Sequence, residues 1–174
     1  MGKFLAVLLF LCAAGGGAFM YYQQVYAYYE EVEPDGETDV VMTSMITDAP
    51  EPVLYDDFRA IDATSSPIRY RACFTTSMSH AMLTETYLLD EDAVPLTAPG
   101  WFDCFDAREI GEAIEAGRAL AFLGTENIEY GIDRVVAIHE DGRGWVWDQI
   151  NPCGEVVFDG NAAPEDCPEP PEGY

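Results

Sequence analysis

The hydrophobic positions of the chain form one long uncharged run at the N-terminus, followed by several short periodic segments. Residues 4–22 contain no charged side chain, and about 20 apolar residues suffice for a helix to cross a bilayer. Lys3 precedes this run, five tyrosines lie at its end and just after it, at residues 21–29, and Glu30 lies beyond them. The pattern predicts a transmembrane helix with a cytoplasmic N-terminus and an exported domain. A cleaved signal peptide is the alternative, because residues 13–18 are small enough for cleavage.

Short segments with β-strand character recur after the apolar run. They are predicted at residues 38–46, 68–74 and 119–123 and, as a hairpin, at 128–150. Asp141-Gly142 marks the hairpin turn. Side chains alternate in the second of these segments, so Arg69 and Arg71 share one face and Tyr70 and Phe74 the other.

Two segments, 78–89 and 106–117, are predicted to be helical. Asp106 can cap the second helix, with Glu109 three residues later, and Gly117 can end it. Together with the strands, these helices predict the α+β class. We expect one small domain with a mostly antiparallel sheet and one or two helices packed on a face.

The distribution of charge divides the chain. Residues 30–57 carry ten acidic side chains and no basic one, residues 58–150 carry sixteen acidic side chains and seven arginines, and residues 151–174 carry six and none. We therefore expect a membrane anchor or signal peptide with an aromatic interface segment at 1–29. An acidic stalk with a possible first strand is expected at 30–57, a folded core at 58–150, and a Pro-rich acidic tail at 151–174.

The net charge of −24 limits the possible partners. Such a surface repels phosphate backbones, which excludes nucleic acid as a partner. A well-solvated surface is the simpler interpretation of the acidic residues. A docking surface for a basic partner is the functional alternative.

Four cysteines lie beyond the apolar run, at residues 73, 104, 153 and 167. An even number is typical of disulfides in an exported domain. The absence of a CxxC spacing argues against a thioredoxin-like site and a zinc site. Of the three possible pairings we favour Cys73–Cys104 together with Cys153–Cys167, the second of which would tie back the acidic tail.

Four sequence segments are distinctive: IDATSSPIRYRACF from residue 61, WFDCFDA from 101, YGIDRVV from 130 and DGRGWVWDQINPCG from 141. Through them the whole chain resembles an alphaproteobacterial family of small membrane-anchored proteins of unknown function. The resemblance implies one anchored domain of this size and carries over no functional residues. Some relatives are labelled histidine kinases.

The kinase label would depend on His80 within the segment SHAMLT. A kinase also needs glycine-rich loops that contact nucleotide phosphates, and the sequence contains none. We therefore expect His80 to be an ordinary surface histidine, and the chain not to be a functional histidine kinase.

A cysteine hydrolase of the cell envelope is the alternative function. Cys104 lies just before the predicted helix at 106–117, where a helix N-terminus would lower the pKa of a thiol. His139 and Asp133 share a strand face and could act as base and orienting acid. A disulfide-bonded Cys104 is the simpler interpretation. The acidic run at residues 90–92 lacks the spacing of a Ca²⁺ loop, so we expect neither a metal nor a cofactor.

The few arginines are the remaining binding candidates. Arg69, Arg71 and Arg134 are expected to hold internal carboxylates, such as Asp62 and Asp103, in bidentate pairs. The functional alternative is an arginine-lined cleft for a carboxylate-bearing ligand or peptide.

The sequence therefore predicts a non-catalytic binding or assembly module anchored in the cell envelope. Residues 4–22 would contact the inner membrane as a single-pass anchor, with the domain in the periplasm. A periplasmic protein secreted after signal cleavage is the alternative location.

Overall fold

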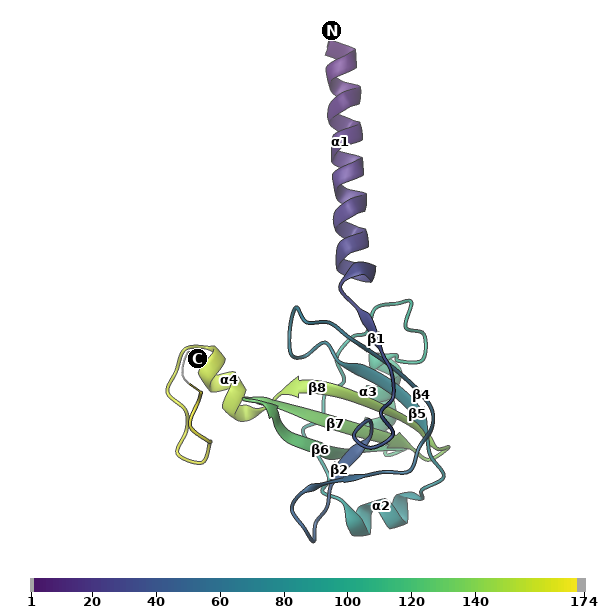
Figure 1. Cartoon of the computed structure of the whole chain (residues 1–174), viewed down its shortest axis with the longest axis vertical. Helices are drawn as coiled ribbons and strands as arrows, with labels where there is room; N and C mark the ends of the chain where they lie inside the picture. The colour runs from purple at the N-terminus through teal and green to yellow at the C-terminus, as the bar shows by residue number, and fades with distance from the viewer. Residues whose placement is uncertain (1, 172–174) are drawn as a thin grey trace.

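A computed structural model describes residues 2–171 and shows a long helix that stands clear of the folded domain (Figure 1). Helix α1 spans Gly2–Tyr22 and continues through a π-helical turn, η1, at Gln23–Ala27. No residue of α1 is buried. The 26 residues Gly2–Ala27 are long and apolar enough to cross a membrane, a test that a signal sequence would also pass.

The domain is built on a six-stranded sheet in which every neighbouring pair is antiparallel. In spatial order its strands are β1 (Glu30–Val32), β4 (Asp56–Asp62), β5 (Arg71–Thr75), β8 (Arg143–Ile150), β7 (Ile132–His139) and β6 (Ala119–Glu129). A second, two-stranded sheet pairs β2 (Val41–Thr43) with β3 (Pro50–Pro52).

Both faces of the large sheet are buried, because alternate side chains of its central strands enter two separate cores. The first core contains Ala72, Phe74, Val136, Ile138 and Val146 from the sheet, with Val40, Met42 and Leu83 packed over them. The second contains Cys73, Val135, Ala137, Trp145 and Trp147, covered by Phe102, Phe105, Ile110 and Ala113.

Three further helices complete the fold, and each has a side chain that caps its N-terminus. Ser79 caps α2 (His80–Thr86) and Asn151 caps α4 (Pro152–Phe158). In α3 (Ala107–Glu115) the Asp106 carboxylate accepts hydrogen bonds from the backbone N–H groups of Arg108 and Glu109. The predicted α+β class, with a mostly antiparallel sheet after an N-terminal apolar helix, is confirmed.

The predicted hairpin has the expected turn but a later start. Gly142 adopts a φ of 91° at the turn. A second turn at Tyr130-Gly131, where Gly131 has a φ of 76°, ends β6. Ile128 therefore belongs to β6 and not to the first strand of the hairpin.

The domain boundaries differ from those expected from charge. The acidic segment 30–57 is not a stalk, because β1, β2 and β3 lie within it and its apolar residues Val40, Met42 and Val53 are buried. The tail that follows residue 150 begins with α4. Charge was a poor guide because most acidic side chains of this segment point to solvent, whereas Asp39 and the apolar residues Val40, Met42 and Val53 are buried.

Candidate functional site

The end of the apolar helix packs directly on the domain. The Trp101 indole stacks on Tyr26, with ring centroids 6.2 Å apart, and its Nε1 donates a hydrogen bond to the Val25 carbonyl at 2.7 Å. Tyr29 contacts the same indole edge-on and accepts a hydrogen bond from Arg69. Only two residues separate η1 from β1. The helix is therefore joined to the sheet without a flexible linker.

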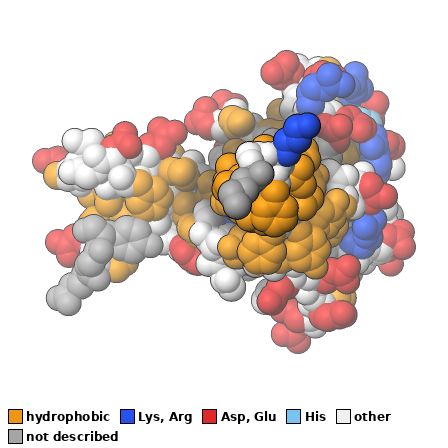
Figure 2. Space-filling view, turned by 90° about the horizontal axis from the view of Figure 1, so that it is seen from above, with side chains coloured by type: hydrophobic (Ala, Val, Ile, Leu, Met, Phe, Trp, Pro, Cys, Tyr) orange, Lys and Arg blue, Asp and Glu red, His pale blue; other side chains and the backbone are white. Residues whose placement is uncertain are grey.

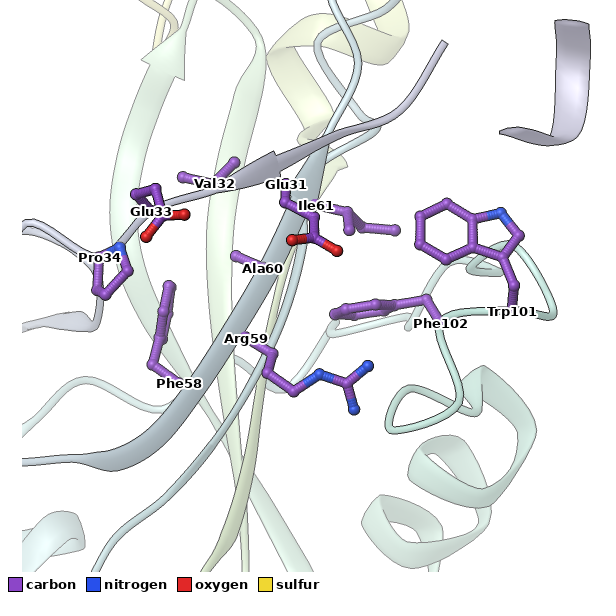
Figure 3. A pocket seen from close by; sticks show the side chains of 10 residues that line it. All are labelled: Glu31, Val32, Glu33, Pro34, Phe58, Arg59, Ala60, Ile61, Trp101 and Phe102. Atoms are coloured by element: carbon purple, nitrogen blue, oxygen red, sulfur yellow. The ribbon is translucent and has the colours of Figure 1, made fainter. Parts of the chain in front are cut away.

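A cavity of about 370 Å³ lies beside this junction, between the edge of the large sheet and the loop that carries Trp101 (Figure 3). Its lining comes from β1 and the two residues after it, from β4 and from the 101–102 loop: Glu31, Val32, Glu33, Pro34, Phe58, Arg59, Ala60, Ile61, Trp101 and Phe102. This volume falls within the range of sites that bind small molecules or single side chains.

Two carboxylates and three aromatic rings give the cavity its chemistry. Glu31 and Glu33 are exposed, and neither forms an ion pair or a hydrogen bond within residues 2–171. In Figure 3 the Glu31 carboxylate points toward the side of the cavity that holds Phe102 and Arg59. Carboxylates next to aromatic faces favour a cationic group.

One of the residues that line the cavity, Arg59, is itself a cation. The Arg59 guanidinium lies over the Phe102 ring, 5.4 Å from its centroid, and forms an ion pair with Asp103 at 3.0 Å. The two side chains are 56% and 78% exposed. An ion pair this exposed contributes little to stability, so the predicted candidate Asp103 pairs with a residue that lines the cavity without fixing the fold.

Arg71 is buried, but its partners are not the carboxylates that the sequence suggested. Its guanidinium donates hydrogen bonds to the backbone carbonyls of Leu96, Ile68, Tyr70 and Thr97. Burial lowers the pKa of Arg71 to about 10. The residue therefore holds the irregular 96–97 loop against the sheet, and backbone carbonyls take up four of its five N–H donors.

Arg134 forms a bidentate pair with Asp148, and not with Asp62 or Asp103, the carboxylates that the sequence suggested. Its Nε and Nη2 atoms donate to the two carboxylate oxygens of Asp148 at 2.7 and 3.0 Å, and its guanidinium lies 3.8 Å from the centroid of the Tyr70 ring. Burial opposes the charge on Arg134, but the hydrogen bonds to Asp148 and the charge attraction of Asp148, Tyr70 and Asp62 together outweigh it and raise the pKa of Arg134.

Asp62 lines a second cavity of about 400 Å³ together with Arg134 and Asp148. One Asp62 carboxylate oxygen accepts a hydrogen bond from the Ala63 N–H at 2.7 Å, and Asp62 forms no ion pair with an arginine within residues 2–171. Asp148 already occupies the two forked donors of Arg134. The expected arginine-lined cleft for a carboxylate is therefore not formed by these residues.

The residues of the hydrolase alternative are not brought together. Cys104 is bonded to Cys73, and His139 Nδ1 lies 2.9 Å from Asp141 at the hairpin turn. Asp133 lies six residues away on β7, roughly 20 Å along the strand, where it accepts a hydrogen bond from Asn151. The candidate nucleophile is thus a disulfide, and its base and acid point to other partners.

The structure forms both disulfides that the sequence favoured, Cys73–Cys104 and Cys153–Cys167. Cys12, in α1, is the free cysteine. We therefore expect one titratable thiol per chain when the full-length protein is unfolded without reductant, and none after Cys12→Ser. Thiol titration measures this count, and a second thiol would reopen the question of a reactive Cys104.

His80 and the acidic run at 90–92 form hydrogen bonds within the fold. His80 is half-buried at the start of α2, and its Nε2 lies 2.9 Å from the Ile138 carbonyl oxygen. Asp90 accepts a hydrogen bond from the Asp92 N–H, and burial raises its pKa. Among residues 2–171 no group of three or more His, Cys, Asp or Glu side chains is arranged to hold a metal ion.

The sequence analysis did not predict the cavity beside β1. From the sequence, Glu31 and Glu33 were interpreted only as acidic residues that follow the apolar run, and Trp101 only as part of a distinctive segment. The spacing of two residues between Glu31, in β1, and Glu33, just after β1, was the one available signal.

Comparison with known proteins gives one match. The model of a family described as "Family of unknown function (DUF6446)" matches residues 40–168. No curated protein and no solved structure matches the chain.

Proposed function

Because the chain belongs to this family of unknown function, we propose a function from its structure. The protein is a membrane-anchored module that holds an acidic α+β domain at the outer surface of the inner membrane, where it binds a positively charged segment of a partner protein. The observation that carries this proposal is the cavity next to the anchor, which Glu31 and Glu33 line together with Phe58, Trp101 and Phe102 and in which neither carboxylate has a side-chain partner within residues 2–171.

The charge of the whole domain supports a basic partner. Seen along α1, acidic side chains are distributed around the outline of the domain, whereas lysine and arginine gather on one side (Figure 2). A net charge of −24 attracts a basic segment over a distance of about one Debye length and raises its association rate. The cavity beside β1 would then be the specific binding site for a basic segment that this general attraction brings close.

The anchor and the disulfides support the proposed location. Lys3 in the first turn of α1 and the glutamates of β1 after the helix favour an exported domain, and disulfides persist outside the cytoplasm.

The topology is testable in cells. A reporter that is active only outside the cytoplasm, fused after Tyr174, should be active, and the fusion should stay in the membrane pellet after carbonate extraction. Activity with release into the supernatant would indicate a cleaved signal peptide. A stable fusion without activity would contradict export.

Binding is testable with the full-length protein in phosphatidylcholine vesicles. A labelled peptide of alternating lysine and threonine should bind, and the matched peptide of glutamate and threonine should not. Anisotropy titrations give the Kd, which should rise with ionic strength because part of the attraction is screened. Equal binding of the two peptides, or binding of neither, would contradict the proposed function.

A further inference from the structure

We propose that the basic segment binds as an added β-strand along β1 and inserts a lysine or arginine side chain into the cavity between β1 and Trp101. This inference rests on the proposed function and specifies the site and the mode of binding.

The first argument is the open edge of the large sheet. β1 is the outermost strand, and within residues 2–171 no other strand pairs with its free side. An edge strand presents unpaired N–H and C=O groups, to which an extended peptide adds by main-chain hydrogen bonds. Pro34, which has no N–H, follows β1 closely and limits the strand to a short edge.

The second argument is the direction of the side chains on β1. Glu31 is paired with Ile61 and lies on the face of the second core, while Val32 packs against the first core. Alternate side chains of a strand added next to β1 point to the same face as Glu31. One of them would therefore reach the cavity that Phe102 and Trp101 line.

The third argument is the chemistry of that cavity. Glu31 and Glu33 supply negative charge that no side chain within residues 2–171 neutralises. The aromatic faces add cation–π attraction. The Arg59 guanidinium over Phe102 is an example, within the protein, of a cation held by one of these rings.

The same features argue against a second copy of the chain as the occupant. Two β1 edges pairing with each other would bring Glu30, Glu31 and Glu33 of one copy opposite the glutamates of the other, and like charges on paired strands repel. In this way, charged residues on an edge strand prevent the sheets of two copies from pairing edge to edge. A basic strand would instead be attracted to β1, because its cations would lie opposite the carboxylates of β1.

The test uses the vesicle-bound full-length protein and the lysine-threonine peptide. Glu31→Gln with Glu33→Gln should weaken binding about tenfold, which corresponds to about 1.4 kcal/mol. Glu165→Gln with Asp166→Asn is the matched control, since it removes two exposed charges from the C-terminal tail; it should change the Kd less than twofold. Both variants should keep the wild-type melting temperature, because the four side chains are exposed.

Hydrogen exchange tests the mode of binding in the same sample. The peptide should slow exchange of the backbone amides in residues 30–33, and the double glutamine variant should lose this protection. Equal weakening by the cavity variant and the tail control, or unchanged exchange at β1, would overturn the added strand while leaving the proposed function in place. Protection of β1 by phosphatidylcholine vesicles alone, with no further effect of peptide, would assign the cavity to a lipid headgroup and overturn it as well. A wild-type protein with no preference for the basic peptide would overturn both proposals.

Discussion

Replacing Arg134 with methionine is expected to destabilise the domain by about 3–5 kcal/mol, the usual cost of leaving one partner of a buried ion pair without the other. The Asp148 side chain is 5% exposed, so its carboxylate would lose two hydrogen bonds without gaining water. Small domains are stable by only about 5–15 kcal/mol. Denaturant unfolding of the full-length protein in detergent should therefore show a clearly lower midpoint.

The exposed ion pair provides the control for this prediction. Arg59→Met removes the same charge from an exposed ion pair with Asp103 and is expected to change stability by less than about 1 kcal/mol. Adding Asp148→Leu to Arg134→Met should recover part of the lost stability, because the unpaired carboxylate is then gone. Similar losses for Arg59→Met and Arg134→Met would contradict this account of the buried pair.

Removing the Cys73–Cys104 disulfide with two alanines is expected to cost about 3–4 kcal/mol. A cross-link that closes a loop of 31 residues restricts the unfolded chain by roughly this amount in the chain-entropy description. Both sulfurs also belong to the second core, where Cys73 is buried and Cys104 packs against it. The midpoint of denaturant unfolding, compared with the wild type under oxidising conditions, measures the loss.

Removing the second disulfide, Cys153–Cys167, should give a different result. No residue after Trp147 belongs to either core cluster among residues 2–171, so opening this bridge frees the tail while the sheet stays folded. We expect Cys153→Ala with Cys167→Ala to leave the main unfolding midpoint nearly unchanged and to make the chain after Phe158 sensitive to protease. A main transition lowered as much as by loss of Cys73–Cys104 would show that the tail is part of the cooperative unit.

Local signals in the sequence determined most of the secondary structure. Asp106 and Gly117 predicted the ends of α3, and the alternation around Arg71 and Phe74 predicted β5 and its two faces. These signals succeed because a helix cap or an alternating strand depends on residues only a few positions apart. The long apolar run predicted α1 for the same reason.

The partner of Arg134 is a feature that local sequence signals did not predict, because it depends on the register between two strands. A two-residue turn at Asp141-Gly142 would pair Arg134 with Gln149, whereas the observed register pairs it with Asp148. A shift of one residue moves every side chain of a strand to the other face. Arg71 is similar, since its carbonyl partners at 96 and 97 lie 25 and 26 residues away in a loop without periodicity.

The sequence by itself therefore determined the apolar helix, the α+β class, the hairpin strands, β5, α2 and α3. Its four cysteines beyond the apolar run made two disulfides the expectation. Only the tertiary structure decided that β1 is an open edge, that Trp101 packs on Tyr26, and that Glu31 and Glu33 line a cavity with Phe102. The physical reason is distance along the chain. These contacts join residues that are tens of positions apart, and the closing of the sheet and the loops around it, which no local pattern encodes, brings them together.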